Sequence, residues 1–410
     1  MRTTAASGLI ALTAMLGVAA SMTVAGPATA GPLPATAAPA KAPPPANQLY
    51  GVSCPSSTYC VAVGINENAE ASVKGGGALI QTWNGRTWTS VAPKAPKGAL
   101  AAELLGVSCA TAKSCVAVGL YLNGRGVGVP LAETWNGRAW TPGTPARPSG
   151  SAGGQLDNVS CRTANSCVAV GSYSTSAGSA ALAESWNGGT WTMARPPEPK
   201  GRVAGELIKV SCPSTTYCVA VGTSGTSTAD FALAEAWNGK TWSRMPVQPP
   251  VSGKYGTELT GVSCTSAASC VAVGTGSAAG GGLSSFAEVW NGRAWAAGKM
   301  SWPKGTRRPY LVAVSCRSAK SCVAVGFADA DFDAGGHTGR AAATSWNGRT
   351  WTAATVPAPG KGKASLFNAV SCPATADCVA VGQLGPYNSD EGSGLAGFWN
   401  GRGWRLAATP

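Results

Sequence analysis

Histidine is almost absent from this chain of 410 residues, which contains only His337. A structural zinc site takes four ligands, and the 14 cysteines, which occur as seven pairs, do not divide into such sites with one histidine. His337 could act as a general base, but no nucleophile can be identified beside it in the sequence. We therefore interpret it as a polar residue of an exposed loop.

Long apolar segments are scarce too, and the one of nearly membrane-spanning length lies between about residues 8 and 25. Arg2 precedes this segment, and the small-residue tripeptide from Ala28 to Ala30 follows it. This order is typical of a secretory signal peptide, here occupying residues 1–30. An uncleaved membrane anchor is the alternative interpretation.

Residues 31–46 are mostly proline and alanine, a composition that predicts an extended, solvated linker. Residues 47–410 remain for the folded domain. The chain has no second apolar segment of spanning length. We expect a secreted, extracellular monomer that has no membrane contact after signal cleavage.

Acidic residues number only 18 against 31 lysines and arginines, which gives a net charge of +13, although charged residues make up 12% of the chain. The basic residues gather between the repeats described below, for example at Lys94 and Lys97 and at Arg307 and Arg308. One interpretation is that they keep exposed loops soluble. The other is a polyanionic partner, such as a cell-wall polymer or an acidic glycan. No nucleic acid is expected, because these loops do not interleave aromatic with basic residues.

Seven copies of one pattern fill the rest of the chain. Each copy has a cysteine pair, a short apolar run, and two tryptophans around an Asn-Gly turn. Its first cysteines follow one another at intervals of 51 to 56 residues, at Cys54, Cys109, Cys161, Cys212, Cys264, Cys316 and Cys372. Such a period is typical of a four-stranded repeat. The sequence thus predicts an all-β fold, a seven-bladed β-propeller with four-stranded antiparallel blades.

Four short strands, a to d, are expected in each copy. In the first copy, strand a covers 49–54, and strand b is the Cys-Val-Ala-Val run at 60–63, which Gly64 is expected to end. Strand b is apolar throughout, as in a strand covered on both faces. Strands c and d flank Asn84 and Gly85, which tolerate the positive φ of a tight hairpin turn. The tryptophans on either side recur in all copies, so we interpret them as packing residues and not as a sugar platform.

The two cysteines of each copy lie at the ends of strands a and b, within reach of a disulfide if they face each other. In the chain-entropy model, closing so small a loop stabilises a blade by roughly 2 kcal/mol. An even count and the predicted secretion favour one intrablade disulfide per blade. The predicted pairs are Cys54 with Cys60, Cys109 with Cys115, Cys161 with Cys167, Cys212 with Cys218, Cys264 with Cys270, Cys316 with Cys322, and Cys372 with Cys378.

The combined pattern, L-x-x-V-S-C-x5-C-V-A-V-G followed by L-A-E-x-W-N-G-x-x-W, resembles secreted actinobacterial propeller repeats. It is more distantly similar to the BNR or Asp-box propellers of sialidases and photosystem assembly factors. The resemblance covers nearly all of residues 47–404 and implies the fold. W-N-G-x-x-W keeps the turn and second tryptophan of an Asp-box but lacks its aspartate. The arginine triad, the nucleophilic tyrosine with its glutamate and the acidic aspartate of a sialidase cannot be assigned to positions in this chain.

One face of the predicted ring varies between copies and is the functional candidate. It carries the b to c loops, at 65–78, 120–130, 172–181, 223–232, 275–285, 327–341 and 383–394. The loop at 327–341 has Asp329, Asp331 and Asp333 at alternate positions, as in a calcium loop. Ala334 stands where a calcium loop has glycine, and Arg340 stands where it has its last acid. A calcium site and a solvated acidic loop are therefore both open.

Glutamates recur two residues before the first tryptophan in four copies, at Glu133, Glu184, Glu235 and Glu288. Paired carboxylates would suit glycoside hydrolysis. Arg138, Lys240 and Arg293 lie across the same turns, so we interpret the glutamates as partners in cross-strand ion pairs on the surface. Gln81, Thr344 and Gly397 replace them in the other copies, as expected at a tolerant position.

These observations favour a secreted binding module for an extracellular glycan, cell-wall polymer or protein, without a cofactor unless calcium binds. The alternative is an extracellular glycosidase or lyase that uses the variable loops. A central pocket lined by two or three acids would favour the enzyme. A flat face with a positive bias would favour binding.

For the acidic loop, we expect that calcium at millimolar concentration leaves the melting temperature unchanged, because the calcium-loop pattern is incomplete. Thermal unfolding with and without calcium measures this directly. A rise in melting temperature that Asp331→Ala abolishes would instead establish the metal site.

Overall fold

The computed structural model describes residues 47–67, 77–199, 201, 204–226, 228–250, 256–277, 283–302, 306–329, 339–360, 363–385 and 392–410. The signal peptide and linker predicted at 1–46 lie outside these residues. So do Asp331, Asp333 and His337. The described part of the chain contains no helix with the length and apolarity needed to traverse a bilayer.

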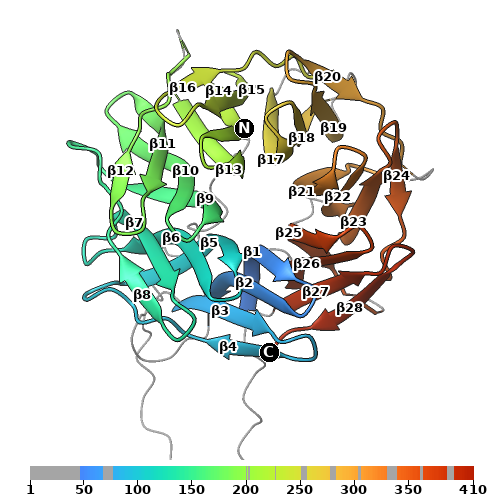
Figure 1. The fold of residues 1–410 in the computed structure, drawn as a ribbon, viewed down its shortest axis with the longest axis horizontal. Coiled ribbons are helices and arrows are strands. Elements are labelled where there is room, and N and C mark those ends of the chain that lie inside the picture. The colour runs from blue at the N-terminus through green and yellow to red at the C-terminus, as the bar shows by residue number, and fades with distance from the viewer. Residues whose placement is uncertain are drawn as a thin grey trace, which may run out of the picture. The chain divides into compact units, whose positions relative to one another are not determined.

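Seven four-stranded antiparallel sheets surround a central axis, each built from four consecutive strands (Figure 1). The predicted seven-bladed propeller is therefore confirmed. Blades 1 to 3 contain β1 (Asn47–Ser56), β2 (Tyr59–Asn66), β3 (Gly77–Trp83), β4 (Trp88–Val91); β5 (Ala101–Thr111), β6 (Ser114–Leu122), β7 (Gly128–Trp135), β8 (Trp140–Gly143); β9 (Gly154–Thr163), β10 (Ser166–Thr175), β11 (Gly178–Trp186) and β12 (Trp191–Met193). Blades 4 and 5 contain β13 (Ala204–Ser214), β14 (Tyr217–Gly225), β15 (Asp230–Trp237), β16 (Trp242–Arg244); β17 (Thr257–Ser266), β18 (Ser269–Ser277), β19 (Leu283–Trp290) and β20 (Trp295–Gly298). Blades 6 and 7 contain β21 (Tyr310–Ser318), β22 (Ser321–Ala328), β23 (Arg340–Trp346), β24 (Trp351–Ala354); β25 (Ser365–Ala374), β26 (Asp377–Leu384), β27 (Ser393–Trp399) and β28 (Trp404–Ala408).

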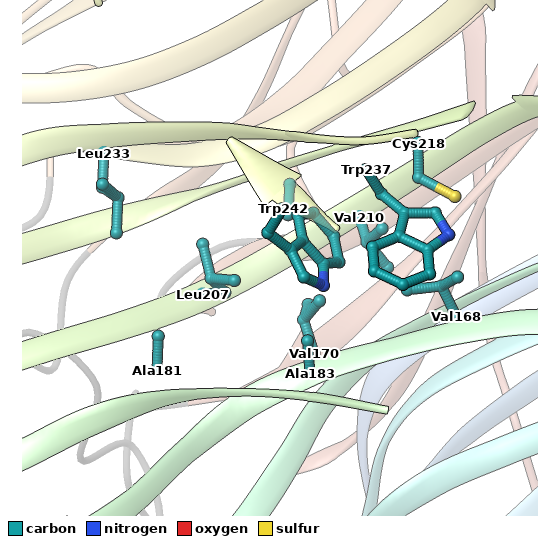
Figure 2. Packing of buried hydrophobic residues seen from close by; sticks show 11 residues of the cluster. Val168, Val170, Ala181, Ala183, Leu207, Val210, Cys218, Leu233, Trp237 and Trp242 are labelled. Atoms are coloured by element: carbon teal, nitrogen blue, oxygen red, sulfur yellow. The ribbon is translucent and has the colours of Figure 1, made fainter. Parts of the chain in front are cut away.

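The hydrophobic core lies between adjacent blades, which explains why the second strand of each blade is apolar on both faces. Figure 2 shows one such interface, where Val170 and Ala183 of blade 3 lie against Leu207 and Trp242 of blade 4. In every blade the two tryptophans of the repeat face each other across the outer hairpin, with ring centroids 5.3 to 5.6 Å apart. Their packing role is the one that the sequence indicated.

All seven predicted disulfides are present, each within one blade. A second regular contact joins neighbouring blades. The backbone N–H of the first cysteine in each blade donates to a serine hydroxyl of the preceding blade, as Cys109 does to Ser53, at 2.9 to 3.0 Å. This serine comes directly before the first cysteine of its own blade. Seven such bonds run around the whole ring.

The glycine after each C-V-A-V run does not end the strand, contrary to the expectation from sequence. β2 continues past Gly64 to Asn66, and the other second strands continue in the same way. Beside this glycine, the first strand of every blade has a register shift that leaves one residue unpaired, as in a β-bulge. A Cβ on the glycine would lie only 1.8 to 2.2 Å from a carbonyl oxygen of the first strand. The glycine is therefore required by close backbone approach.

The outer hairpin turn is tight, as expected, but only one of its two Asn-Gly residues has positive φ. Trp83 pairs directly with Trp88, so four residues form the loop. Only its glycine has positive φ, 89° at Gly85 and 86° to 97° in the other blades. The asparagine side chain instead accepts hydrogen bonds from two backbone N–H groups, as Asn84 does from Arg86 and Thr87.

The ring closes without an exchanged strand, because blades 1 and 7 are complete within their own segments. Hydrogen bonds also cross the seam between blades 7 and 1. Cys54 N–H donates to Ser371 Oγ across the seam, and Asn368 Nδ2 donates to the Leu49 carbonyl oxygen. The seam thus has the same serine to cysteine bond as the other six interfaces.

Gly382 provides a test of the bulge, because a Cβ there would lie 2.1 Å from the Leu366 carbonyl oxygen. We expect Gly382→Ala to destabilise the protein by about 1–3 kcal/mol. Gly403→Ala, in the same blade, is the matched control, since a Cβ at that position meets nothing within 4 Å. Denaturant unfolding compares the two variants, and equal stabilities would contradict the close approach.

Candidate functional site

The central channel opens on the face that carries the loops between second and third strands. Side chains from the first strand of each blade surround this opening. Each of these side chains comes from the residue just before the buried leucine of the repeat, which is a phenylalanine in blade 7. We call this residue the mouth position. It holds Gln48, Glu103, Gln155, Glu206, Glu258, Tyr310 and Leu366. The mouth position pairs with the residues that follow the bulge glycine, for example Glu103 with Leu120 and Glu258 with Thr275.

Carboxyl groups cluster on one side of this mouth. Glu103, Asp157, Glu206 and Glu258, which we call the acidic arc, come from the first strands of blades 2 to 5. Asp157 joins them because it is the unpaired bulge residue of β9, two positions after the mouth position of blade 3. Glu67 and Asp230, at the adjoining loops, interact electrostatically with Glu103 and Glu206 respectively.

Burial raises the pKa values of Glu103, Asp157 and Glu206, and the like charges of neighbouring groups add to the effect at Glu103 and Glu206. The pKa of Glu103 rises to about 8 through burial and the repulsion of Asp157 and Glu67. The pKa of Asp157 rises to about 7 through burial, although a hydrogen bond from Gln155 and the charge of Lys209 oppose this. Burial, with Asp157, Glu258 and Asp230, holds the pKa of Glu206 well above its ordinary value.

Several polar contacts order the mouth. Gln155 Nε2 donates to Asp157 Oδ1 at 2.6 Å, and the Tyr310 hydroxyl donates to Glu258 Oε1 at 2.5 Å. Glu103 is only 4% exposed, and its Oε2 has no hydrogen-bond partner within the described part of the chain. The same holds for Asp157 Oδ2. Buried carboxylate oxygens in this state carry a desolvation cost that a ligand can relieve.

The opposite side of the mouth is aromatic and apolar. In blade 6 the rings of Tyr310 and Phe327 stack with centroids 5.0 Å apart. Phe327 and Leu366 form a small buried cluster with which Tyr310 packs. The mouth therefore has a carboxylate side and an apolar side.

Deeper in the channel lies a cavity of about 140 Å³. Its walls are mostly valine, glycine and alanine from all seven first strands, with Asn158 and Lys209 as polar lining residues. Burial lowers the pKa of Lys209, and the neighbouring Asp157 opposes this. The cavity is smaller than the few hundred Å³ of ordinary small-molecule sites. This cavity is therefore too small to enclose a sugar chain.

The recurring glutamates lie elsewhere, and their interpretation as surface ion pairs is wrong. Glu133, Glu184, Glu235 and Glu288 are all buried, and the described residues form no ion pair between them and Arg138, Lys240 or Arg293. The segment leaving each blade covers this position in the next blade: Ala146 N–H donates to Glu184 Oε2. In the next such segment Pro197 occupies the equivalent place and has no N–H, and both oxygens of Glu235 lack partners among the described residues.

The substitutions at this position in the other blades are also structural. Gln81 is fully buried and donates from Nε2 to the Pro410 oxygen, so the segment after β28 covers blade 1 as the linkers cover the other blades. Gly397 leaves room for Phe367, whose Cζ would lie 2.5 Å from an added Cβ. The position is therefore part of the interior.

The proposed calcium ligands receive no support from the described residues. Asp329 forms an ion pair with Arg340, at 2.6 Å between Oδ2 and Nε, and accepts a hydrogen bond from the Arg307 backbone N–H. Asp331 and Asp333 lie outside the described residues. Within the described residues, no three His, Cys, Asp or Glu side chains form a metal-binding group.

Comparison with known proteins agrees with the fold. No known family model matches the chain, and no curated protein matches it. Among solved structures, the chain is similar to YCF48 bound to D1 peptide (14% identity, 84% of this chain and 92% of that chain, TM-score 0.48). It is also similar to a GH74 xyloglucanase from Xanthomonas campestris (13% identity, 88% of this chain and 54% of that chain, TM-score 0.53). A Hadza microbial sialidase is a third (10% identity, 67% of this chain and 62% of that chain, TM-score 0.42). The chain spans about half the length of the xyloglucanase, and these similarities concern the propeller fold alone.

The four buried glutamates generate a pH prediction. Burial raises their pKa values to about 7 for Glu133, Glu184 and Glu288, and to about 8 for Glu235. A carboxyl group whose pKa is raised by folding makes its full contribution to stability below its unfolded pKa. This contribution is lost as the pH rises through the pKa of the folded state. Thermal unfolding should therefore show lower stability at pH 9 than at pH 5. Glu103, Asp157 and Glu206 contribute with the same sign.

Changing all four glutamates to glutamine should reduce this difference between pH 5 and pH 9. Gln81→Glu provides the opposite variant, because it places a carboxyl group against the Pro410 oxygen and should increase the loss at pH 9. Unfolding midpoints that respond to neither change would show that these positions do not control the pH dependence.

Proposed function

We propose that the chain is an extracellular binding module that takes a glycan or protein ligand at the mouth of the central channel. The observation that carries this proposal is the acidic arc, which gathers four carboxyl groups from the first strands of blades 2 to 5. Buried carboxylate oxygens without partners offer acceptors for hydroxyl or ammonium groups of a ligand. Seven disulfides support an extracellular setting.

A polyanionic ligand does not suit this mouth, despite the net charge of +13. The carboxyl groups of the arc would repel its charges at short range. The basic residues between the blades, such as Lys94, Lys97 and Arg307, are exposed. Any attraction of a polyanion therefore belongs to these outer segments.

An extracellular glycosidase or lyase is the second candidate, because central acids are what we expected such an enzyme to show. Carboxyl groups with pKa values of about 8 and about 7, as Glu103 and Asp157 have, suit a general acid near neutral pH. The cavity beneath them supports binding over hydrolysis, since at about 140 Å³ it is too small to enclose a sugar chain.

A screen of the intact secreted chain against a glycan array, cell-wall polymers and extracellular proteins tests the proposal. The double variant Glu103→Gln with Asp157→Asn should weaken any ligand found by at least about tenfold, because each charge-assisted hydrogen bond contributes roughly 1.5–3 kcal/mol. Glu184→Gln, which changes a buried carboxyl group away from the mouth, is the matched control. Binding that survives the double variant would place the site elsewhere, and release of saccharide products would favour the enzyme.

A further inference from the structure

We propose that the acidic arc binds the ammonium group of a lysine side chain presented by a protein ligand. This inference rests on the proposed function and names the partner that its site fits. Six of the 18 acidic residues of this basic chain surround one mouth, namely Glu67, Glu103, Asp157, Glu206, Asp230 and Glu258. Glu103 adds an independent sign of a ligand, since it is 96% buried and leaves Oε2 without a partner in the described part of the chain.

The shape of the site favours a lysine side chain over an amino sugar. The arc lies on the innermost strands, and the space beyond it is a cavity of about 140 Å³ beside Asn158 and Lys209. A lysine carries its charge on a thin, flexible four-carbon stem, whereas an amino sugar carries it directly on a ring. The stem can lie along the apolar side formed by Tyr310 and Leu366 while the ammonium group reaches the carboxylates.

The chain already contains an internal precedent for this contact. Lys209 lies on β13 beside Asp157, and the two side chains interact electrostatically. Glu103 and Glu206 interact with the same Asp157, so an incoming ammonium group meets carboxyl groups from three successive blades. Lys209 satisfies part of this demand, and it competes with the ligand for Asp157.

Binding should be linked to proton release. Burial raises the pKa values of Glu103, Asp157 and Glu206. Like charges add to this at Glu103, which faces Asp157 and Glu67, and at Glu206, which faces Asp157, Glu258 and Asp230. They must lose their protons to hold a cation, whereas a lysine ammonium group stays charged below about pH 10. The affinity should therefore rise between pH 5.5 and pH 8.5, which distinguishes this site from exposed carboxylates that ionise near pH 4.

Titration calorimetry of the intact chain with a hexalysine peptide at physiological salt tests the inference. Hexalysine should bind at pH 8, and the hexapeptide of Nε-acetyllysine should not. A glucosamine hexamer should bind at least about tenfold more weakly than hexalysine. If the glucosamine hexamer binds equally well or better, the lysine assignment is wrong.

Variants separate the arc from general attraction to acidic surface. Glu103→Gln and Asp157→Asn should each weaken hexalysine binding by about tenfold or more, while the control Glu184→Gln leaves it unchanged. Lys209→Met should strengthen binding, because it removes the competing ammonium group, and misfolding cannot produce such a gain. Absent binding at millimolar peptide, or an affinity that none of the mouth variants alters, would overturn the inference. The proposed function would survive that result if a ligand from the screen still depended on the mouth.

Discussion

The hydrogen bond between the first cysteine of one blade and the serine of the blade before it is the contact on which the rest of the ring depends. It uses a backbone N–H at the inner end of each interface, at 2.9 to 3.0 Å in all seven cases. A net contribution of about 1 kcal/mol per bond is modest. Its repetition gives every interface the same inner spacing, including the seam between Ser371 and Cys54. The first strands are therefore held at regular positions around the axis, and their side chains inherit that regularity.

Regular inner strands explain how the chain can hold several like charges close together. Carboxyl groups on flexible loops would separate to reduce their repulsion. Glu103, Asp157 and Glu206 instead lie on strands that the bulge, the close glycine contact and the serine bond fix in place. Burial on these strands raises the pKa values of all three groups, and repulsion between neighbouring carboxyl groups adds to the effect at Glu103 and Glu206. The disulfides add to this fixation, since each closes the inner hairpin that carries a mouth residue.

The repeat made the fold predictable, whereas the mouth was not recognised. Spacing and composition were sufficient for seven blades, seven disulfides and the paired tryptophans, because each requirement recurs in every copy. The loops between second and third strands vary most between copies, so the sequence indicates function there. The mouth position lies inside the L-x-x-V-S-C strand, one residue before Leu104 in the case of Glu103. The sequence shows it only as a variable residue directly before the recurring leucine. The closeness of Glu103 to Asp157 and Glu206 follows from the arrangement of the blades around an axis.

The recurring glutamates are buried, although their repetition beside basic residues indicated a surface position. In a propeller both faces of a middle strand are covered, so a polar residue there is buried whichever way it points. Blade 7 shows how strictly this interior is packed: Phe367 replaces the usual leucine of the first strand, and Gly397 replaces the glutamate of the third strand against which its ring lies. Each change alone would leave a cavity or a clash. Polar residues of this chain therefore lie in two settings. Inside the blades they are packed and covered, and around the axis they form the acidic mouth.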